Sequence, residues 1–168
     1  MAAGATYTPI ATTTLGTAAT SITFNSFSGY TDLVIVLSAI ADNTNTRYAY
    51  LQFNSDTGTN YSNTYLSGNG SSAESGRDTS ATYIKGNQFG AAFSSTTNPM
   101  TDIINIQNYS NSTTYKTVLL RSNAAGSGVT ALVGLWRNTA AITSITLGVS
   151  SDKYGIGTTA TLYGIVAA

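Results

Sequence analysis

Short segments in which apolar and polar residues alternate recur along the chain, and this alternation constrains the fold more than any other feature. Clusters of Asn, Asp, Ser and Gly separate the segments, and no stretch combines a helical apolar period with helix caps. We therefore expect an all-β chain that forms one antiparallel β-sandwich domain over residues 1–168, jelly-roll-like, with about 8–11 strands. The expected strands are Tyr7–Leu15, Thr20–Phe24, Thr31–Ala41, Arg47–Asn54, Asn60–Leu66, Thr79–Lys85, Asp102–Asn108, Thr113–Ser122, Gly128–Arg137, Ile142–Val149 and Thr158–Val166.

The apolar residues also predict which parts of these strands are covered. Alternate apolar residues over Val129–Leu135 and over Ile145–Val149 predict one packed and one wetter face for each strand. Leu33–Ile40 is apolar on both faces, which predicts a cover on both sides, either the opposite sheet plus a loop or a neighbouring subunit; we favour the subunit. Gly68–Asp78 and Gly86–Pro99 are expected to be exposed loops because they are rich in Gly and Ser or contain Pro.

The composition excludes several kinds of chemistry. The chain has no His and no Cys, which rules out a Ser-His-Asp triad, a thiolate nucleophile, disulfides and Cys/His zinc sites. Seven basic residues balance seven acidic ones, and only 8% of the chain is charged, so the surface is mostly hydroxyl and amide. A neutral chain lacks the positive field that nucleic acids and anionic membranes attract, and it also lacks the net repulsion that keeps copies apart. We expect no nucleic-acid partner, no membrane segment, no secretory leader, and self-association.

Few residues are candidates for catalysis or ligand binding. Gly68–Ala73 matches G-x-G-x-x-A, but no helix is expected after it, so we interpret it as a flexible loop. Glu74, the only Glu, lies in that loop with Asp78 nearby, and solvated charges explain both better than a glycosidase pair. Asp56–Asn60 offers oxygens to Ca²⁺ but lacks further acidic residues, which favours an Asx-type turn. We therefore expect no enzymatic activity, no metal and no cofactor.

Eleven tyrosines are an unusual excess, because Tyr combines an apolar ring with a hydroxyl and is common where proteins meet proteins or sugars. Tyr48 and Tyr50 share one face of a strand, whereas Tyr61 and Tyr65 flank a turn-rich hairpin, and Trp136 precedes Arg137. Tyr61, Tyr65 and Trp136 are the candidates for residues that face a partner. The simpler alternative is that the tyrosines fill the rims of the core and that Trp136 is a buried residue at a strand end.

Several segments, taken together as strings of residues, resemble a known group of proteins. They are Tyr7–Leu15, Leu51–Ser62, Tyr65–Ser72, Val133–Leu147 and Ala160–Ile165, and the most specific parts are Gly-Leu-Trp-Arg at 134–137 and Leu-Tyr-Gly-Ile at 162–165. The chain resembles jelly-roll capsid cement or appendage proteins of tailed bacteriophages, including cyanophages. This resemblance implies a virion structural protein, a homotrimer that either locks major capsid protein subunits together on the shell or forms part of a tail fibre. It brings no catalytic or ligand-binding signature.

Between these roles we expect a capsid cement or decoration protein, made in the host cytoplasm and located on the capsid surface of the virion. Folding without disulfides in a reducing cytosol and binding by shape and hydrogen bonds both suit the composition. A tail-fibre subunit usually carries a coiled-coil or β-helical shaft, and we expect none in this sequence. Two alternatives stay open. One is a tail-fibre or baseplate component that binds host-surface glycans, and the other is a carbohydrate-binding module that uses Tyr61, Tyr65 or Trp136 as stacking platforms.

Overall fold

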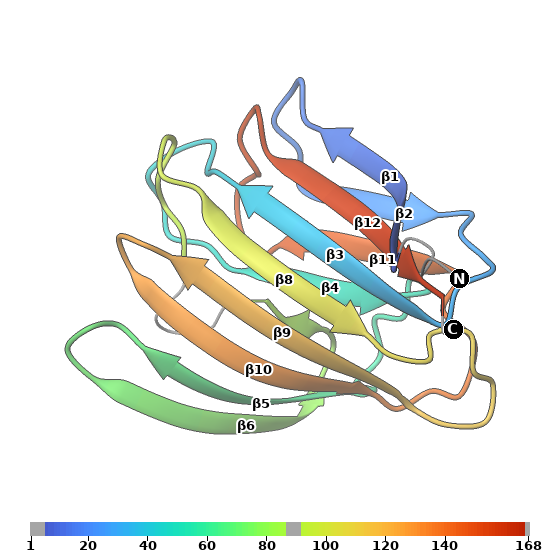
Figure 1. Ribbon diagram of the computed structural model, residues 1–168. Helices are drawn as coiled ribbons and strands as arrows, with labels where there is room; N and C mark the ends of the chain where they lie inside the picture. Colours follow the sequence, from blue (N-terminus) through green and yellow to red (C-terminus); the bar gives the residue numbers. More distant parts are fainter. Residues whose placement is uncertain (1–5, 87–91, 167–168) are drawn as a thin grey trace.

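The computed structural model describes residues 6–86 and 92–166, which form an antiparallel β-sandwich (Figure 1). This confirms the predicted all-β class. The strands in the described part of the chain are β1 (Tyr7–Thr14), β2 (Ser21–Asn25), β3 (Asp32–Ala39), β4 (Ala49–Phe53), β5 (Tyr61–Gly68), β6 (Ala73–Ala81), β7 (Ile84–Lys85), β8 (Met100–Ile106), β9 (Lys116–Ala124), β10 (Gly128–Trp136), β11 (Ser144–Val149) and β12 (Thr159–Ile165). Many of them are rich in Val, Ile, Thr and aromatic residues, whose side chains fit a pleated surface.

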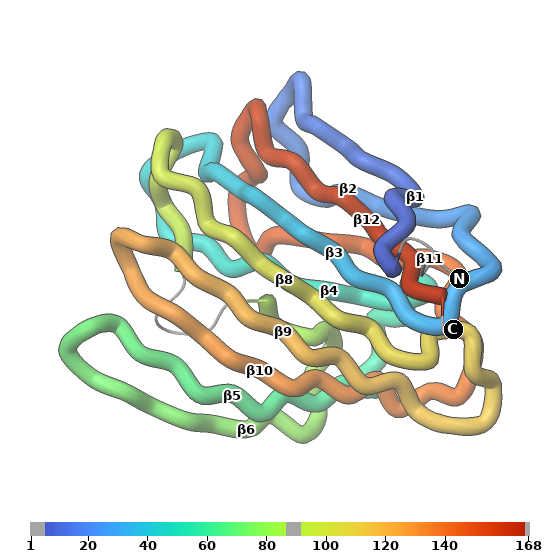
Figure 2. Tube along the Cα trace, in the orientation of Figure 1, coloured from blue at the N-terminus to red at the C-terminus, as the bar shows by residue number. Residues whose placement is uncertain are grey.

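The strands divide unequally between two sheets. The larger sheet has the order β1-β12-β3-β8-β9-β10-β5-β6, and the smaller sheet has the order β2-β11-β4-β7. In Figure 1, β2, β11 and β4 lie behind the larger sheet, and Figure 2 shows β1 and β12 side by side at its edge. The hairpins β5–β6 and β9–β10 both join the larger sheet beyond β8, so they widen it without a matching addition to the smaller sheet.

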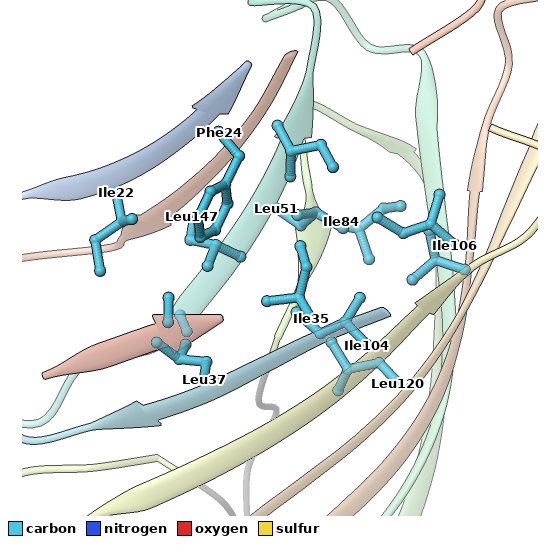
Figure 3. Close-up of a cluster of buried hydrophobic side chains, with 14 of the residues drawn as sticks. Ile22, Phe24, Ile35, Leu37, Leu51, Ile84, Ile104, Ile106, Leu120 and Leu147 are labelled. Carbon is cyan, nitrogen blue, oxygen red and sulfur yellow. The ribbon is translucent and has the colours of Figure 1, made fainter. Parts of the chain in front are cut away.

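The core lies between the facing sides of the two sheets. Leu33, Ile35 and Leu37 of β3 are fully buried, and they alternate with less buried residues as the pleat requires. Figure 3 shows Ile35 and Leu37 facing side chains of the smaller sheet, such as Leu147. The labelled residues of this cluster are Ile22, Phe24, Ile35, Leu37, Leu51, Ile84, Ile104, Ile106, Leu120 and Leu147. Burial of so many large apolar side chains is the main force that holds the two sheets together.

The prediction of an exposed loop over Gly68–Asp78 is wrong, because most of this segment belongs to strand β6. With this strand, the described residues form twelve strands and not the expected 8–11. β5 ends at Gly68 and β6 begins at Ala73, with a tight turn between them. In that turn the side chain of Asn69 accepts hydrogen bonds from the backbone N–H of Ser71 and Ser72, at 3.0 and 2.9 Å. Gly and Ser here encode a hairpin turn and a polar edge strand. The G-x-G-x-x-A pattern therefore spans a β-hairpin and cannot cradle a dinucleotide at a helix N-terminus.

The segment from Thr79 to Pro99 also differs from its prediction. The strand expected over Thr79–Lys85 is split, because β6 ends at Ala81 in the larger sheet and β7 joins the smaller one. Within the expected loop Gly86–Pro99, Phe93 pairs with Arg47 through two backbone hydrogen bonds of 3.1 and 3.2 Å. Residues 87–91 of that loop lie outside the described residues.

The double-sided apolar segment Leu33–Ile40 is covered largely by this chain alone. Its inward residues face the smaller sheet, and Val34 on the outer side is only 4% exposed. Val34 lies between Tyr163 of β12 and Asn105 of β8 in the strand register. A neighbouring subunit is therefore not needed to bury Val34, and the first of the two expected covers, one within the chain, accounts for it.

Two buried cations fix loops at opposite ends of the sandwich. Arg47 is 0% exposed and donates to the carboxylate of Asp42, to the backbone oxygen of Lys153 and to the side chain of Asn43. Lys116, also 0% exposed, donates from Nζ to the carbonyl oxygens of residues 114 and 139, at 2.8 and 3.1 Å. Because breaking such contacts would leave an unpaired buried charge, these residues hold the loops in place.

Candidate functional site

Two of the candidate partner-facing residues are part of the core. Trp136 at the end of β10 and Tyr61 at the start of β5 are each 0% exposed, with their rings stacked at a centroid distance of 6.4 Å. The ring of Phe53 packs against that of Trp136 at a centroid distance of 5.5 Å. Burial, opposed by a backbone hydrogen bond at Phe53 and assisted by the charge of Asp56, raises the pKa of Tyr61 to about 12. The structure thus corrects the partner-facing prediction for Tyr61 and Trp136 and confirms the simpler interpretation of Trp136 as a buried residue at a strand end.

The Asp56–Asn60 turn closes over these rings. Asp56 accepts hydrogen bonds from the indole Nε1 of Trp136 at 2.7 Å, the backbone N–H of Gly58 at 2.9 Å and the amide of Asn60 at 2.9 Å. Burial tends to raise the pKa of Asp56, but these hydrogen bonds outweigh it and lower the pKa. The hydrogen bond from Gly58 confirms the expected Asx-type turn, and both carboxylate oxygens of Asp56 accept hydrogen bonds within it. No group of three or more acidic side chains that could hold a metal ion occurs within residues 6–86 and 92–166.

Tyr65, the third candidate, is half-buried and lies opposite Gly76 of β6. A Cβ at Gly76 would come within 2.6 Å of the Tyr65 hydroxyl, so the ring occupies the space of the missing side chain. Burial, followed by the charges of Glu74 and Asp78, raises the pKa of Tyr65. Asp78 forms an ion pair with Lys85 at 2.6 Å. Glu74 and Asp78 therefore lie on a strand that the sequence did not predict, and Tyr65 packs against that strand.

Asp102 of β8 is the carboxyl group most strongly affected by burial. It is 0% exposed and lies opposite Ser122 of β9 on the inner side of the larger sheet. Burial, only partly offset by the Ser122 hydroxyl, raises the pKa of Asp102 to about 7. A raised carboxyl pKa in a cleft would suggest a general acid, but Asp102 has no access to a substrate. We interpret it as a buried group whose ionisation opposes folding.

An apolar groove lies on the outer face of the larger sheet, over β8, β9, β10 and β5. It consists of two adjoining depressions of about 560 and 690 Å³ that share Leu66, Arg121 and Ala131. Its most exposed apolar side chains are Leu66 at 60%, Val129 at 59%, Leu119 at 45% and Val133 at 41%. Isolated apolar residues are normal on a surface, whereas a contiguous set rimmed by polar residues marks a site of interaction.

The expected division of β10 into a packed and a wetter face is confirmed, and the groove lies on the wetter face. The inward residues of this strand are Thr130, Leu132, Gly134 and Trp136, so the alternating set that begins at Val129 faces water. By contrast, Ile145, Leu147 and Val149 of β11 face the core. Both faces of β10 carry apolar residues, and the alternation could not tell which face another sheet covers. The signal in the sequence was the placement of Trp136, which shares the inward face with Leu132.

One cation lies at the centre of the groove. Arg121 is flanked in the strand register by Ile103 of β8 and Ala131 of β10, and Leu66 of β5 follows Ala131 in the same row. Arg121 is exposed and forms no ion pair with any residue that the structure describes. The groove thus offers one guanidinium among exposed apolar side chains, with polar residues such as Asn105, Gln107 and Asn123 also lining it. Such a surface suits a protein partner that supplies apolar area and an acceptor for Arg121.

Comparisons with known proteins add no relative to this picture. No family model, no curated protein and no solved structure matches the chain. Within the described residues there is also no helix long and apolar enough to cross a membrane.

Proposed function

We propose that the chain is a non-enzymatic structural protein of a tailed-phage virion, a trimeric capsid cement or decoration protein that binds the major capsid protein shell through the groove. The observation that carries the proposal is the set of exposed apolar side chains in the groove, which includes Leu66, Val129 and Val133. These side chains contribute little to the core of this chain, because they lie on the outer face of the larger sheet and are 41–60% exposed. Their burial against a partner would release water from apolar surface, which is the main driving force of association.

The strand order supports the jelly-roll interpretation. Without the hairpins β5–β6 and β9–β10, the remaining strands form two sheets, β1-β12-β3-β8 and β2-β11-β4-β7. In this arrangement the chain passes repeatedly from one sheet to the other, as in a double-sheet jelly roll of eight strands. The two additional hairpins supply β9, β10 and β5, which form most of the groove. The proposed binding surface is therefore built on the additions to an eight-strand framework.

A shell subunit fits the groove better than a like face of a second copy. If two grooves met face to face, each Arg121 would approach another cationic, apolar surface, and like charges in contact disfavour association. A shell subunit with a carboxylate opposite Arg121 would pair with it. The groove residues nearest Arg121 in the register, Ile103, Ala131 and Leu66, are all apolar.

The proposed trimer would use surfaces other than strand edges. The outer strand β6 carries Glu74, Arg77 and Asp78, and the outer strand β1 contains Pro9 followed by a β-bulge. Charged residues, proline and bulges all discourage the addition of another strand. Because the chain has so few charges, we expect trimer formation to depend little on salt. Light scattering at micromolar protein and low salt would test this, and a monomer mass would contradict the trimer.

The test of the capsid role is the amount of this protein in purified virions, relative to the major capsid protein, by quantitative mass spectrometry. A ratio close to that of the shell protein supports decoration of the capsid. A ratio far below it contradicts that role and favours the tail-fibre or baseplate alternative.

A matched pair of variants tests the groove itself. Leu66→Asp should reduce binding of the purified protein to capsids that lack it by about 30-fold or more, because it places a charge at the centre of an apolar contact. Ile156→Asp is the control, since Ile156 is 63% exposed but does not line the groove. Equal binding by the two variants would contradict the proposed contact, and urea unfolding of both verifies that each is folded.

A further inference from the structure

The outer side of the smaller sheet carries a pocket of different chemistry from the groove. Tyr48 and Tyr50 line it from β4 and the residues before it, Tyr83 and Lys85 from the segment that ends in β7, and Ser150 from the end of β11. Its volume is about 260 Å³. We call it the tyrosine pocket. The candidates Tyr61 and Trp136 are not part of it.

The backbone of the smaller sheet fixes the position of each ring. Tyr50 lies opposite Gly148 of β11, and a Cβ at Gly148 would come within 2.1 Å of the Tyr50 ring. Glycine weakens a strand interior, so its presence here marks a close approach that the ring requires. The ring of Tyr83 stacks on that of Tyr50 at a centroid distance of 4.7 Å and an angle of 28°. The two rings therefore form one rigid aromatic surface supported by strands.

Polar groups surround this aromatic surface at fixed positions. The backbone N–H of Tyr48 donates to the hydroxyl of Ser150 at 3.0 Å, and the backbone N–H of Ser150 donates to the carbonyl of Tyr48 at 2.9 Å. Lys85 lies opposite Tyr50 in the strand register and is neutralised by its ion pair with Asp78 at 2.6 Å. Tyr48 is 40% exposed, so part of its side chain is open to a ligand.

From this arrangement we propose that the tyrosine pocket binds a neutral carbohydrate. A sugar ring has apolar C–H faces that suit an aromatic ring, and hydroxyl groups at its edges that suit Tyr, Ser and paired charges. A nucleic acid would require an excess of positive charge along its path, whereas the pair Lys85–Asp78 leaves the pocket without net charge. The chemistry thus favours a neutral, hydroxyl-rich ligand.

The ligand is an oligosaccharide and not a single sugar, because a second depression adjoins the pocket. It has a volume of about 490 Å³ and shares Tyr83 and Lys85 with the pocket. Its other lining residues come from β6 and the turn after it, and include Asp78, Thr79 and Ser80, which offer further hydrogen-bonding groups. Arg77 also lines this depression, and its Nε donates to the hydroxyl of Thr64 at 3.1 Å. Tyr83 lies at the junction and should contact two neighbouring sugar units.

The experiment is isothermal titration of the full chain with neutral hexasaccharides of glucose, galactose, mannose and N-acetylglucosamine. We expect one of them to bind in the micromolar to millimolar range, with at least about tenfold weaker binding by Tyr83→Ala and by Tyr48→Ala. Tyr115→Ala is the control, because Tyr115 is 53% exposed and lies outside the pocket. Absence of binding by the whole panel, or binding that neither pocket variant weakens, would overturn the proposal.

Tyr48→Ala and one further variant, Leu66→Asp, distinguish a sugar site in the tyrosine pocket from a loss of folding and from a site in the groove. Tyr48 is already exposed, so Tyr48→Ala remains informative if Tyr83→Ala unfolds the chain. Leu66→Asp, which changes the groove on the opposite sheet, should bind the hexasaccharide as tightly as the unchanged chain does. A loss of sugar binding in Leu66→Asp would contradict a site confined to the tyrosine pocket. Failure of capsid binding with intact sugar binding would contradict only the capsid role.

Discussion

On the outer face of the larger sheet, apolar side chains lie exposed around one arginine, whereas on the outer face of the smaller sheet tyrosine rings stack on each other and polar groups surround them. Both surfaces are built on strands, yet the first offers area and little hydrogen bonding, and the second offers a small rigid cavity with many hydrogen-bonding groups. Area of the first kind suits a protein surface, and a cavity of the second kind suits a small polar ligand. Contact with a shell and contact with a sugar would thus use opposite sides of the sandwich.

The core between the two sheets holds the two outer surfaces in place, and it contains Asp102, a buried carboxyl group whose ionisation lowers the stability of the fold. We expect the free energy of unfolding to fall as the pH rises from about 4 to about 7. The reason is that the pKa of Asp102 is raised from 3.8 to about 7 in the folded chain, so the folded state holds a proton that the unfolded state has lost. The full effect is of the order of 4 kcal/mol and is constant above pH 7.

Urea unfolding of the unchanged chain and of Asp102→Asn at about pH 5 and about pH 8 tests this prediction. The unchanged chain should lose stability between the two pH values, and Asp102→Asn should lose much less. Asp56 does not obscure the result, because its pKa is lowered and its contribution is lost only at more acidic pH. An equal loss in both proteins would show that another group titrates in this range. If the prediction holds, the two outer surfaces are best compared below pH 7.

The second prediction contrasts added side-chain volume on the two outer faces. Gly148→Ala should destabilise the chain by about 1–3 kcal/mol, because its Cβ would lie 2.1 Å from the Tyr50 ring and would displace it. Ala131→Val in the groove should change stability by less than about 0.5 kcal/mol, because Ala131 is exposed. Thermal and urea unfolding measure both variants.

The hexasaccharide titration extends the same contrast to binding. Gly148→Ala should weaken sugar binding, whereas Ala131→Val should leave it unchanged. If Gly148→Ala affected neither stability nor sugar binding, the position of the Tyr50 ring would not depend on the glycine beneath it. That result would contradict a rigid aromatic surface in the tyrosine pocket.

The sequence was sufficient for the fold class, because alternation and turn residues are local signals. It was insufficient for Gly68–Asp78, because its Gly, Ser and charged residues are typical of a loop. Most of this segment instead belongs to β6, the outermost strand at one edge of the larger sheet. Such a strand needs few apolar residues, since it packs mainly against β5. The segment forms a strand because it pairs with β5, and this pairing cannot be predicted from the segment alone.

The two surfaces were only partly predictable for a related reason. The shared face of Tyr48 and Tyr50 was visible, and both residues line the tyrosine pocket. Tyr83 joins them because the chain changes sheets between β6 and β7, which no local pattern indicates. In the same way, the exposure of Val129 depends on which face of β10 turns toward the core. The residue types of both surfaces are visible in the sequence, whereas contacts between distant strands determine which of these residues face water.

The last and smallest expected effect tests directly which face of the larger sheet is open in the isolated chain. Val129→Thr exchanges a methyl group for a hydroxyl on a side chain that is 59% exposed, and we expect a stability change within about 0.5 kcal/mol. Val118→Thr makes the same exchange at a residue of β9 that is 0% exposed, and it should cost about 1–3 kcal/mol because the hydroxyl is buried. Urea midpoints at equal m-values measure the difference. If Val129→Thr cost as much as Val118→Thr, the groove would be covered in the isolated chain and could not be its docking surface; if it cost nothing yet weakened capsid binding, the valine would serve the partner and not the fold.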